Sequence, residues 1–162
     1  MNKITASAVE KFAVELLEKQ GYDYLYGPDI APDGDTPARQ SFEEVLLLEK
    51  LKEAVARLNP TIPANTREAI KQLQRINSPE LIANNETFHR MLTEGIKVTY
   101  RKDGEDRGDL VWLIDFNHPE KNNFAVVNQL TVIENNVNKR PDVVLFVNGL
   151  PLVVMELKNP TD

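Results

Sequence analysis

Residues 140–160 of the 162-residue chain have the sequence RPDVVLFVNGLPLVVMELKNP, and this stretch decides the fold. It holds two apolar runs, DVVLFV at residues 142–147 and LPLVVMELK at residues 150–158, separated by Asn148-Gly149. An Asn-Gly pair between two apolar runs is typical of a β-hairpin turn. Because both runs are apolar on both of their faces, we expect two central strands that are covered from both sides.

The sequence before this hairpin predicts further strands and, earlier still, helices. Three short runs at residues 96–100, 110–116 and 124–134 are β-rich and divided by turn residues. We expect them to join the hairpin in one sheet. Helical patterns predict four helices, at about residues 5–20, 42–58, 66–76 and 78–95.

Local signals place the ends of these helices. The first helix has apolar residues at helical spacing, namely Val9, Phe12, Ala13, Leu16 and Leu17. Gly21 is placed to end it, and Gly95 to end the last helix. Ser41 and Glu44 have capping-box spacing, which predicts that the second helix begins directly after Ser41. The fold class is therefore α+β, one domain with a central mixed sheet flanked by helices and a helical insertion at about residues 41–94.

Composition narrows the class of protein. No apolar run reaches the roughly 18 to 20 residues of a membrane helix, so we expect no membrane partner. The sequence contains no cysteine, which excludes disulfides and thiolate metal sites, and its N-terminus lacks the apolar core of a signal peptide. We therefore expect a cytoplasmic protein. The net charge of −6 indicates that any contact with nucleic acid is local.

Three ionisable residues interrupt the apolar hairpin: Asp142, Glu156 and Lys158. Positions 156 and 158 of a strand point to the same face. A charge at a buried strand position must be paired or bind a metal. Two carboxylates could hold Mg²⁺ through oxygen ligands, and a lysine could orient a water molecule during phosphodiester hydrolysis. A second interpretation stays open, in which these residues only mark where each strand leaves the core.

The register of the hairpin decides whether both carboxylates share a face. A two-residue turn at Asn148-Gly149 pairs residues whose numbers sum to 297, which places Asp142 and Glu156 on opposite faces. Metal binding needs an even sum. That requires an odd loop, most simply Val147-Asn148-Gly149, or a compensating bulge within a strand. We expect the even register, with one face shared by Asp142, Val144, Phe146, Val154, Glu156 and Lys158.

Residues 140–160 resemble the nuclease motif in the R subunit of type I restriction–modification enzymes, a branch of the PD-(D/E)xK nuclease superfamily. Both Pro141-Asp142 and Glu156-x-Lys158 match it. The likeness extends upstream through Gly21–Tyr24, Phe88-His89, Gly95–Val98, Leu113–Phe116, Asn123-Phe124 and Asn128-Gln129. It implies a restriction-endonuclease-like fold and Mg²⁺-dependent cleavage of double-stranded DNA, with Mn²⁺ as a substitute. Asp142 and Glu156 would bind the metal, and Lys158 would assist catalysis.

The resemblance also implies a glutamate from the first helix near the metal, and Glu10 matches that position. A helical wheel places Glu10 inside the apolar arc of this helix, which indicates independently that it points inward. Another interpretation is that Glu10 closes a capping box with Ser7.

The family further implies partners and missing parts. Its R subunits act with methyltransferase and specificity subunits, and their motor domains bind ATP through a G-x-x-x-x-G-K-[ST] loop. No such loop, and no helix with the family's Gln-x-x-x-Tyr motif, occurs in this sequence. We therefore expect an incomplete N-terminal nuclease domain whose use of ATP depends on absent motor domains. Two alternatives remain: another PD-(D/E)xK nuclease that acts in DNA repair or cleaves junctions, and a non-catalytic docking module.

Overall fold

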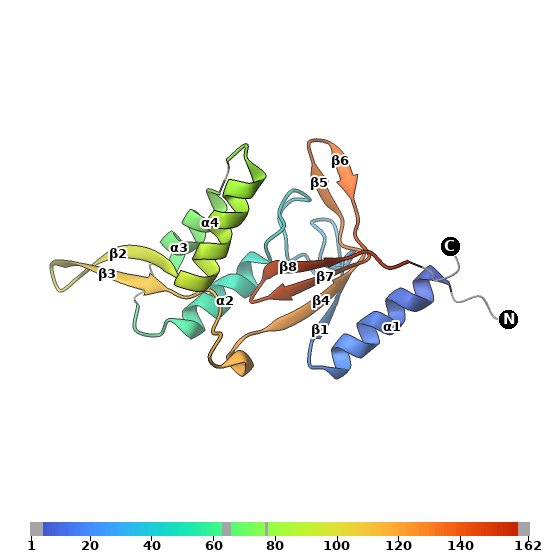
Figure 1. Cartoon of the computed structure of the whole chain (residues 1–162), viewed down its shortest axis with the longest axis horizontal. Coiled ribbons are helices and arrows are strands. Elements are labelled where there is room, and N and C mark those ends of the chain that lie inside the picture. Colours follow the sequence, from blue (N-terminus) through green and yellow to red (C-terminus); the bar gives the residue numbers. More distant parts are fainter. Residues whose placement is uncertain (1–4, 63–65, 77, 159–162) are drawn as a thin grey trace. The chain divides into compact units, whose positions relative to one another are not determined.

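The computed structural model describes residues 5–62, 66–76 and 78–158, so Asn159 and Pro160 of the quoted stretch lie outside the described residues. The chain divides into two compact units (Figure 1). Unit 1 comprises residues 1–49 and 123–162, and unit 2 comprises residues 50–122. Within the described ranges, no helix is both long enough and apolar enough to span a membrane.

Unit 1 is built on a four-stranded sheet with the order β1-β4-β7-β8. Its strands are β1 (Asp23–Tyr26), β4 (Phe124–Asn128), β7 (Val143–Val147) and β8 (Leu150–Met155). β1 is parallel to β4, whereas the β4–β7 and β7–β8 pairs are antiparallel. The expected mixed sheet is therefore present.

The two strands of the hairpin differ in their environment. β7 is central, and residues 143–146 are buried. β8 is an edge strand, and its Val153 and Val154 side chains are 43% and 64% exposed. The expectation of two central strands is thus right for β7 and wrong for β8. An apolar run shows only that a strand can be covered, because the neighbours that cover it come from elsewhere in the chain.

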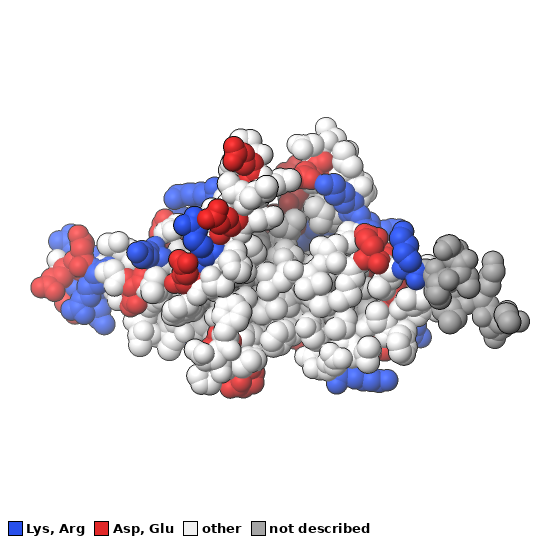
Figure 2. Space-filling model, viewed as in Figure 1, with Lys and Arg blue, Asp and Glu red and all other residues white. Residues whose placement is uncertain are grey.

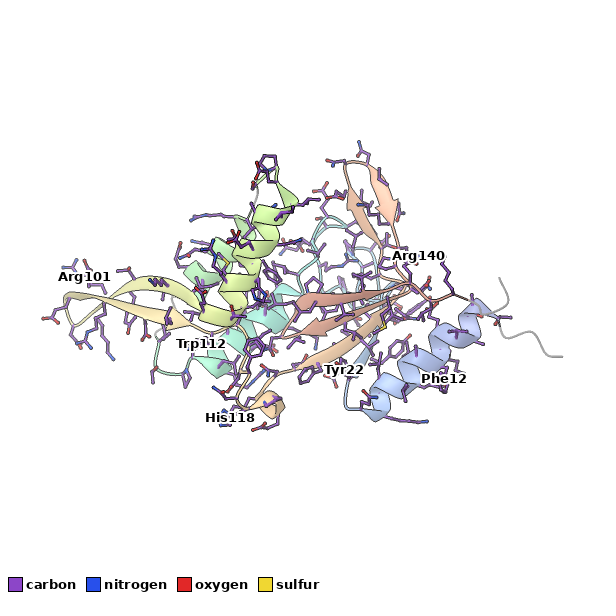
Figure 3. The ribbon with its side chains drawn as sticks, in the orientation of Figure 1. Phe12, Tyr22, Arg101, Trp112, His118 and Arg140 are labelled. Carbon is purple, nitrogen blue, oxygen red and sulfur yellow. The ribbon has the colours of Figure 1, made fainter. Side chains whose placement is uncertain are left out.

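The two faces of this sheet are covered in different ways. Helix α1 (Ala6–Lys19) covers one face, where Val14 packs with Val126, Val143 and Leu145. Thr5 caps this helix, and Gly21, with a φ of 97°, follows its end as expected. Phe12 and Leu16 do not join the core: they are 66% and 47% exposed, and Figure 3 shows Phe12 on the side of α1.

The other face of the sheet is covered by a loop rather than by a helix. Val144 and Phe146 pack there against Ile30 and Leu47. The expected capping box at Ser41 is absent, since the next helix, α2 (Leu48–Leu58), begins later. The Leu47 N–H donates to the Gly149 carbonyl at 3.0 Å. In a helix that began at residue 42, this N–H would instead donate to a carbonyl within the helix, and the tertiary contact would be lost.

Unit 2 contains most of α2, two further helices and an antiparallel hairpin. These elements are α3 (Thr66–Gln74), α4 (Leu81–Glu94), β2 (Ile96–Lys102), β3 (Glu105–Val111) and the 3-10 helix η1 (Pro119–Lys121). Gly95, with a φ of 77°, follows α4 as expected. Figure 2 shows acidic and basic side chains intermixed along the β2–β3 hairpin.

The expectation of one sheet is wrong. Within the described part of the chain, β2 and β3 pair only with each other. In unit 1, β5 (Val132–Glu134) and β6 (Val137–Lys139) form another separate hairpin. The runs at 96–100, 110–116 and 124–134 therefore contribute to three sheets, and residues 112–116 lie beyond β3. Periodicity identifies a strand but carries no information about its partner.

Candidate functional site

The β7–β8 hairpin turns through Asn148 and Gly149, whose φ angles are 52° and 81°. This is the two-residue turn that Asn-Gly favours, because both positions need a positive φ. Val147 pairs with Leu150 directly beside the turn, and these numbers sum to 297. Of the two devices that could give an even register, the three-residue loop Val147-Asn148-Gly149 is therefore not the one that the structure contains.

A bulge in β8 then changes the register. Phe146 pairs with Pro151, but Leu145 pairs with Val153, so Leu152 is the extra residue. From Leu145 to Val143 the paired numbers sum to 298. The expected even register is present, and it arises from the second of the two devices considered, a compensating bulge within a strand.

This register brings the two carboxylates of the hairpin to opposing positions. The last pair is Val143 with Met155, and one further step sets Asp142 opposite Glu156. The Leu157 N–H donates to Asp142 Oδ2 at 2.6 Å, which holds the Asp142 carboxylate against the end of β8. Figure 3 labels Arg140, close to where this segment enters β7.

The burial of these residues corrects part of the argument from sequence. Asp142 is half-buried, whereas Glu156 and Lys158 are exposed. The argument that buried charges must be paired or bind a metal therefore does not apply to Glu156 and Lys158. Their position at an open sheet edge gives a large substrate access to both groups.

Glu10 on α1 faces the end of β4. Its carboxylate accepts hydrogen bonds from Asn128 Nδ2 at 2.8 Å and from Gln129 Nε2, which lies 2.9 Å from Oε1 and 2.8 Å from Oε2. The inward orientation expected from the helical wheel is confirmed. The alternative capping box is absent, because the cap is Thr5, whose hydroxyl accepts from the Ala8 N–H at 3.2 Å.

Gln129 connects Glu10 with the strand that carries Asp142. Its side chain binds both oxygens of Glu10, and its backbone N–H donates to the Asp142 carbonyl at 3.2 Å. Sequence reasoning gave Gln129 and Asn128 no functional role beyond membership of the family-like segments. The signal that could have drawn attention to them is an amide pair directly after a buried apolar run.

A cleft of about 490 Å³ lies beside this amide pair, lined in part by Glu10, Tyr24, Tyr26 and Gln129. Burial is the largest cause that raises the pKa of the Tyr24 phenol, and the neighbouring Tyr26 and Glu10 raise it further. Tyr24 therefore keeps its proton at neutral pH, and its hydroxyl donates to Asn128 Oδ1 at 3.0 Å.

The donor set at the hairpin suits a hard divalent cation. Mg²⁺ is commonly held by one or two carboxylates, with water and substrate phosphate completing its shell. Asp142 and Glu156 provide that number of carboxylates. Among the described residues there is no group of three or more His, Cys, Asp or Glu side chains arranged to hold a metal, so Glu10 does not form a third member of such a group.

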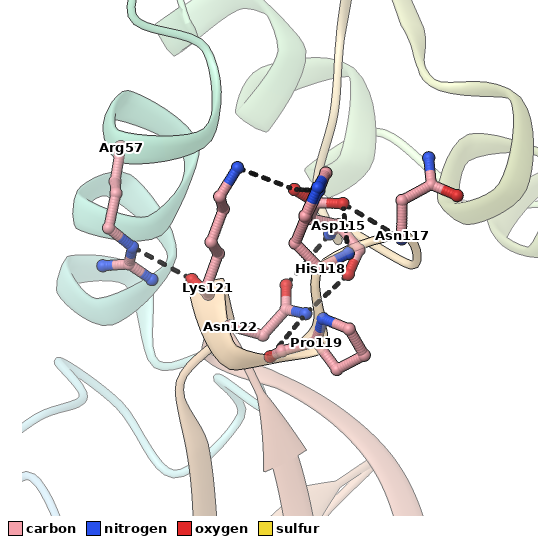
Figure 4. A network of polar contacts seen from close by, with 7 residues as sticks. All are labelled: Arg57, Asp115, Asn117, His118, Pro119, Lys121 and Asn122. Atoms are coloured by element: carbon pink, nitrogen blue, oxygen red, sulfur yellow. Dashed lines mark hydrogen bonds and ion pairs between the residues drawn. The ribbon is translucent and has the colours of Figure 1, made fainter.

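A second polar network, in unit 2, surrounds Asp115 (Figure 4). Its carboxylate accepts from the N–H groups of Asn117 and His118, both at 3.0 Å, and lies 3.8 Å from Lys121 Nζ. Desolvation is the largest single cause and opposes ionisation of Asp115, but the backbone N–H groups of His118 and Asn117 and the His118 ring together outweigh it, so the pKa of Asp115 is lowered. These contacts lie within one loop, so the network shapes residues 115–122.

Comparison with known proteins gives one consistent result. A family model described as the N terminus of the type I restriction enzyme R protein matches residues 3–162. The type I restriction enzyme HindI endonuclease subunit of Haemophilus influenzae is 38% identical over 154 residues, which is 94% of this chain and 15% of the relative. The putative type I restriction enzyme MjaIXP endonuclease subunit of Methanocaldococcus jannaschii is 32% identical over 156 residues, with coverage of 94% and 15%. The chain thus spans 15% of the length of these relatives.

Proposed function

Because this chain belongs to the family of type I restriction enzyme R protein N-terminal regions, we propose that it forms the part of such a protein that cleaves DNA. The reaction is hydrolysis of a phosphodiester bond in double-stranded DNA during restriction of foreign DNA. The proposed fold is that of the PD-(D/E)xK nucleases, with Pro141-Asp142 and Glu156-x-Lys158 as its motif. Unit 1 is the nuclease, and the helical segment expected at about residues 41–94 is an insertion into it.

The observation that carries this proposal is the bulged register of the β7–β8 hairpin. A regular ladder from the same turn would separate Asp142 and Glu156 onto opposite faces. The bulge at Leu152 instead sets them opposite each other on one face. A purely structural hairpin has no need for that parity, whereas two carboxylates that share one cation require it.

The proposed roles follow from the chemistry of each side chain. Asp142 and Glu156 bind Mg²⁺, for which Mn²⁺ can substitute. The bound metal would polarise the scissile phosphate and lower the pKa of a water molecule. Lys158 places its ammonium group where it can orient that water or stabilise the charge growing on the phosphate. Glu10 is assigned to the site from the family resemblance. Helix α1 packs on the sheet face of Val143, and Gln129 links Glu10 to the backbone of Asp142.

The proposal also covers the cellular location and the partners of the protein. The DNA-cleaving unit acts in the cytoplasm, within an assembly that includes methyltransferase and specificity subunits. ATP is used by motor domains that these residues do not include. Exposure of Glu156 and Lys158 supports DNA as the substrate, since a duplex can reach an open sheet edge without entering a closed cavity.

Metal titration tests the assignment of the carboxylates. We expect Mn²⁺ to bind weakly to the wild-type chain and to lose its binding heat in Asp142→Ala, because the two carboxylates repel each other until a cation neutralises them. Calorimetry measures both. Asp106→Ala, at an exposed position of β3, is the matched control. Equal heats for wild type and Asp142→Ala would remove the metal site and favour the docking module.

Cleavage separates catalysis from translocation in an R protein that carries this sequence at its N-terminus. Lys158→Ala should abolish cleavage of DNA and leave ATP hydrolysis unchanged, since the lysine acts only at the scissile phosphate. Lys102→Ala in β2 is the control. Loss of both activities in Lys158→Ala would indicate a structural role. An R protein without ATP hydrolysis in the wild-type form would favour a stand-alone repair or junction nuclease.

A further inference from the structure

We infer that Gln129, assisted by Asn128, is a positioning residue that fixes Glu10 of α1 relative to the strand end at Asp142. The inference rests on the proposed function, because it concerns two residues of the proposed site. Gln129 bridges these two residues: its side chain donates to Glu10 and its backbone N–H donates to the Asp142 carbonyl. Neither Asn128 nor Gln129 needs to touch the DNA or the metal for this role.

The side-chain amides of Asn128 and Gln129 have fixed orientations. An Asn or Gln amide can face a carboxylate only with its NH₂ group. Asn128 is oriented by Tyr24, whose protonated hydroxyl donates to Oδ1 and so leaves Nδ2 for Glu10. Gln129 Nε2 then lies within hydrogen-bonding distance of both Glu10 oxygens, at 2.9 and 2.8 Å. Neutral amides thus surround the Glu10 carboxylate, and within the described part of the chain no cation pairs with it.

The backbone of Gln129 adopts a conformation that is unfavourable for glutamine. Its φ is 55°, in the left-handed region that glycine adopts without strain and that asparagine tolerates better than glutamine does. A turn that served only to redirect the chain would be satisfied by either of those residues. Glutamine at this position therefore indicates that its long side chain, which reaches α1, is needed.

The turn at residues 128–129 is held in place by its neighbours. The Gly27 N–H donates to the Asn128 carbonyl at 2.9 Å. A Cβ atom at position 27 would lie 2.5 Å from that carbonyl oxygen and 2.6 Å from the Gln129 carbonyl carbon, so only glycine allows this approach. The turn is thus bonded to Gly27, directly after β1, and to the Asp142 carbonyl. The Gln129 side chain is aimed at α1 from a fixed base.

The consequence concerns the link between Glu10 and Asp142, because Gln129 joins the Glu10 carboxylate to the backbone of a proposed metal ligand. Among the described residues, these amides provide the side-chain hydrogen bonds between α1 and the end of β4. Without them the apolar contacts of Val14 would remain, and packing of that kind permits small shifts along the helix axis. Partners that orient the residues around a metal typically change metal affinity by 10- to 100-fold when they are removed. Loss of the Gln129 amide should therefore change the Mg²⁺ requirement of cleavage more than it changes the folding of the protein.

The test uses the assembled R protein carrying this sequence, with cleavage measured over a range of Mg²⁺ concentrations. Gln129→Met keeps the length of the side chain and removes its donors, and it should raise the Mg²⁺ concentration for half-maximal cleavage by about 10-fold. ATP hydrolysis and the thermal unfolding midpoint should stay close to wild type. Gln74→Met, at an exposed position of α3, is the matched control.

A reciprocal exchange separates positioning from mere stability. Gln129→Glu places a carboxylate against Glu10 and should impair cleavage more than Gln129→Met does. Combining Gln129→Glu with Glu10→Gln restores a carboxylate–amide pair between the same positions, so the loss of Mg²⁺ affinity in the double variant should be smaller than the sum of the losses in the two single variants. This variant also answers the case in which Gln129→Met fails to fold.

The outcomes distinguish this inference from the proposed function. A wild-type Mg²⁺ requirement in Gln129→Met, together with lost cleavage in Lys158→Ala, overturns the role of Gln129 alone. Losses that simply add in the double variant also overturn it. Normal cleavage by both Lys158→Ala and Asp142→Ala would overturn the proposed function itself.

Discussion

The two hairpins β2–β3 and β7–β8 begin from the same kind of turn and end differently. Asp103-Gly104 has φ angles of 55° and 84°, close to the 52° and 81° of Asn148-Gly149. From the first turn, every pair of β2 and β3 sums to 207, and the ladder runs without interruption from Lys102 to Ile96. From the second turn, the sum changes from 297 to 298 after two pairs.

The difference shows what a single unpaired residue can do. In β2, buried and exposed side chains alternate through Tyr100, so one face packs and the other meets solvent. In β8 the bulge exchanges the faces of all residues beyond Leu152. The regular hairpin thus needs only its turn to fix its register, whereas the placement of Glu156 opposite Asp142 depends on the turn and the bulge together.

The largest effect is expected from breaking the parity of β8. One glycine inserted between Val153 and Val154 should turn Glu156 and Lys158 to the other face and lower DNA cleavage at least about 100-fold. The same insertion between Asp106 and Arg107 of β3 should leave cleavage nearly unchanged. Cleavage assays on the assembled R protein compare the two. Similar activity in both variants would show that the register of β8 does not control the site.

A smaller effect is expected from the first residue of each turn. Asn148 is fully buried, and its Oδ1 accepts from the Asn123 N–H at 2.8 Å. Asn148→Ala should destabilise its hairpin by about 2–3 kcal/mol, from the lost hydrogen bond and the strained φ. Asp103 is exposed, so Asp103→Ala should cost only about 1 kcal/mol from strain. Hydrogen exchange of the amides in each hairpin measures both, and equal losses would contradict the comparison.

A smaller effect still is expected from removing the bulge. Deletion of Leu152 leaves one residue fewer in β8, so a regular ladder from the same turn still sets Asp142 opposite Glu156. Cleavage should therefore fall by less than about 10-fold, far less than after the insertion. Equal damage from the deletion and the insertion would contradict this reasoning. It would show that the site requires the bulge itself, and not only the placement of Asp142 and Glu156 on one face.

The smallest effect is expected in the loop after β3, at residues 115–122. The pKa of Asp115 is lowered, so its ionised contacts stabilise residues 115–122 at every pH above the ordinary value of 3.8 and are lost as the pH falls through the lowered pKa. In an acid titration followed by NMR, the amide signals of Asn117 and His118 should show a transition below pH 3.8. Asp115→Asn should remove this transition, and a transition that persists would have another origin.

The sequence predicted those features that depend on neighbouring residues. The Asn148-Gly149 turn, the glycines that follow α1 and α4, and the inward orientation of Glu10 all follow from local patterns, and the family resemblance is confirmed. The features that were missed depend on distant partners. Leu47 bonds to Gly149 and delays the start of α2, and among the described strands none pairs with the outer edge of β8.

The proposed site shows the same division. Asp142, Glu156 and Lys158 could be selected because charged residues in an apolar stretch stand out in any sequence. Gln129 could not be selected, since its importance depends on a positive φ and on contacts with Glu10 and Asp142 that lie 119 and 13 positions away. The sequence also left open how the even register arises, because a three-residue loop and a β-bulge both place Asp142 and Glu156 on the same face.

The bulge also limits what can be added to the exposed edge of the sheet. A free edge strand is a template on which strands of other molecules can grow. In β8, Pro151 has no N–H to donate, and the irregularity at Leu152 breaks the row of backbone groups beside it. An incoming strand finds only Val153–Met155 as an uninterrupted template, which is the lower limit of strand length in folded proteins. The same irregularity that aligns two carboxylates thus protects a valine-rich edge from open-ended aggregation.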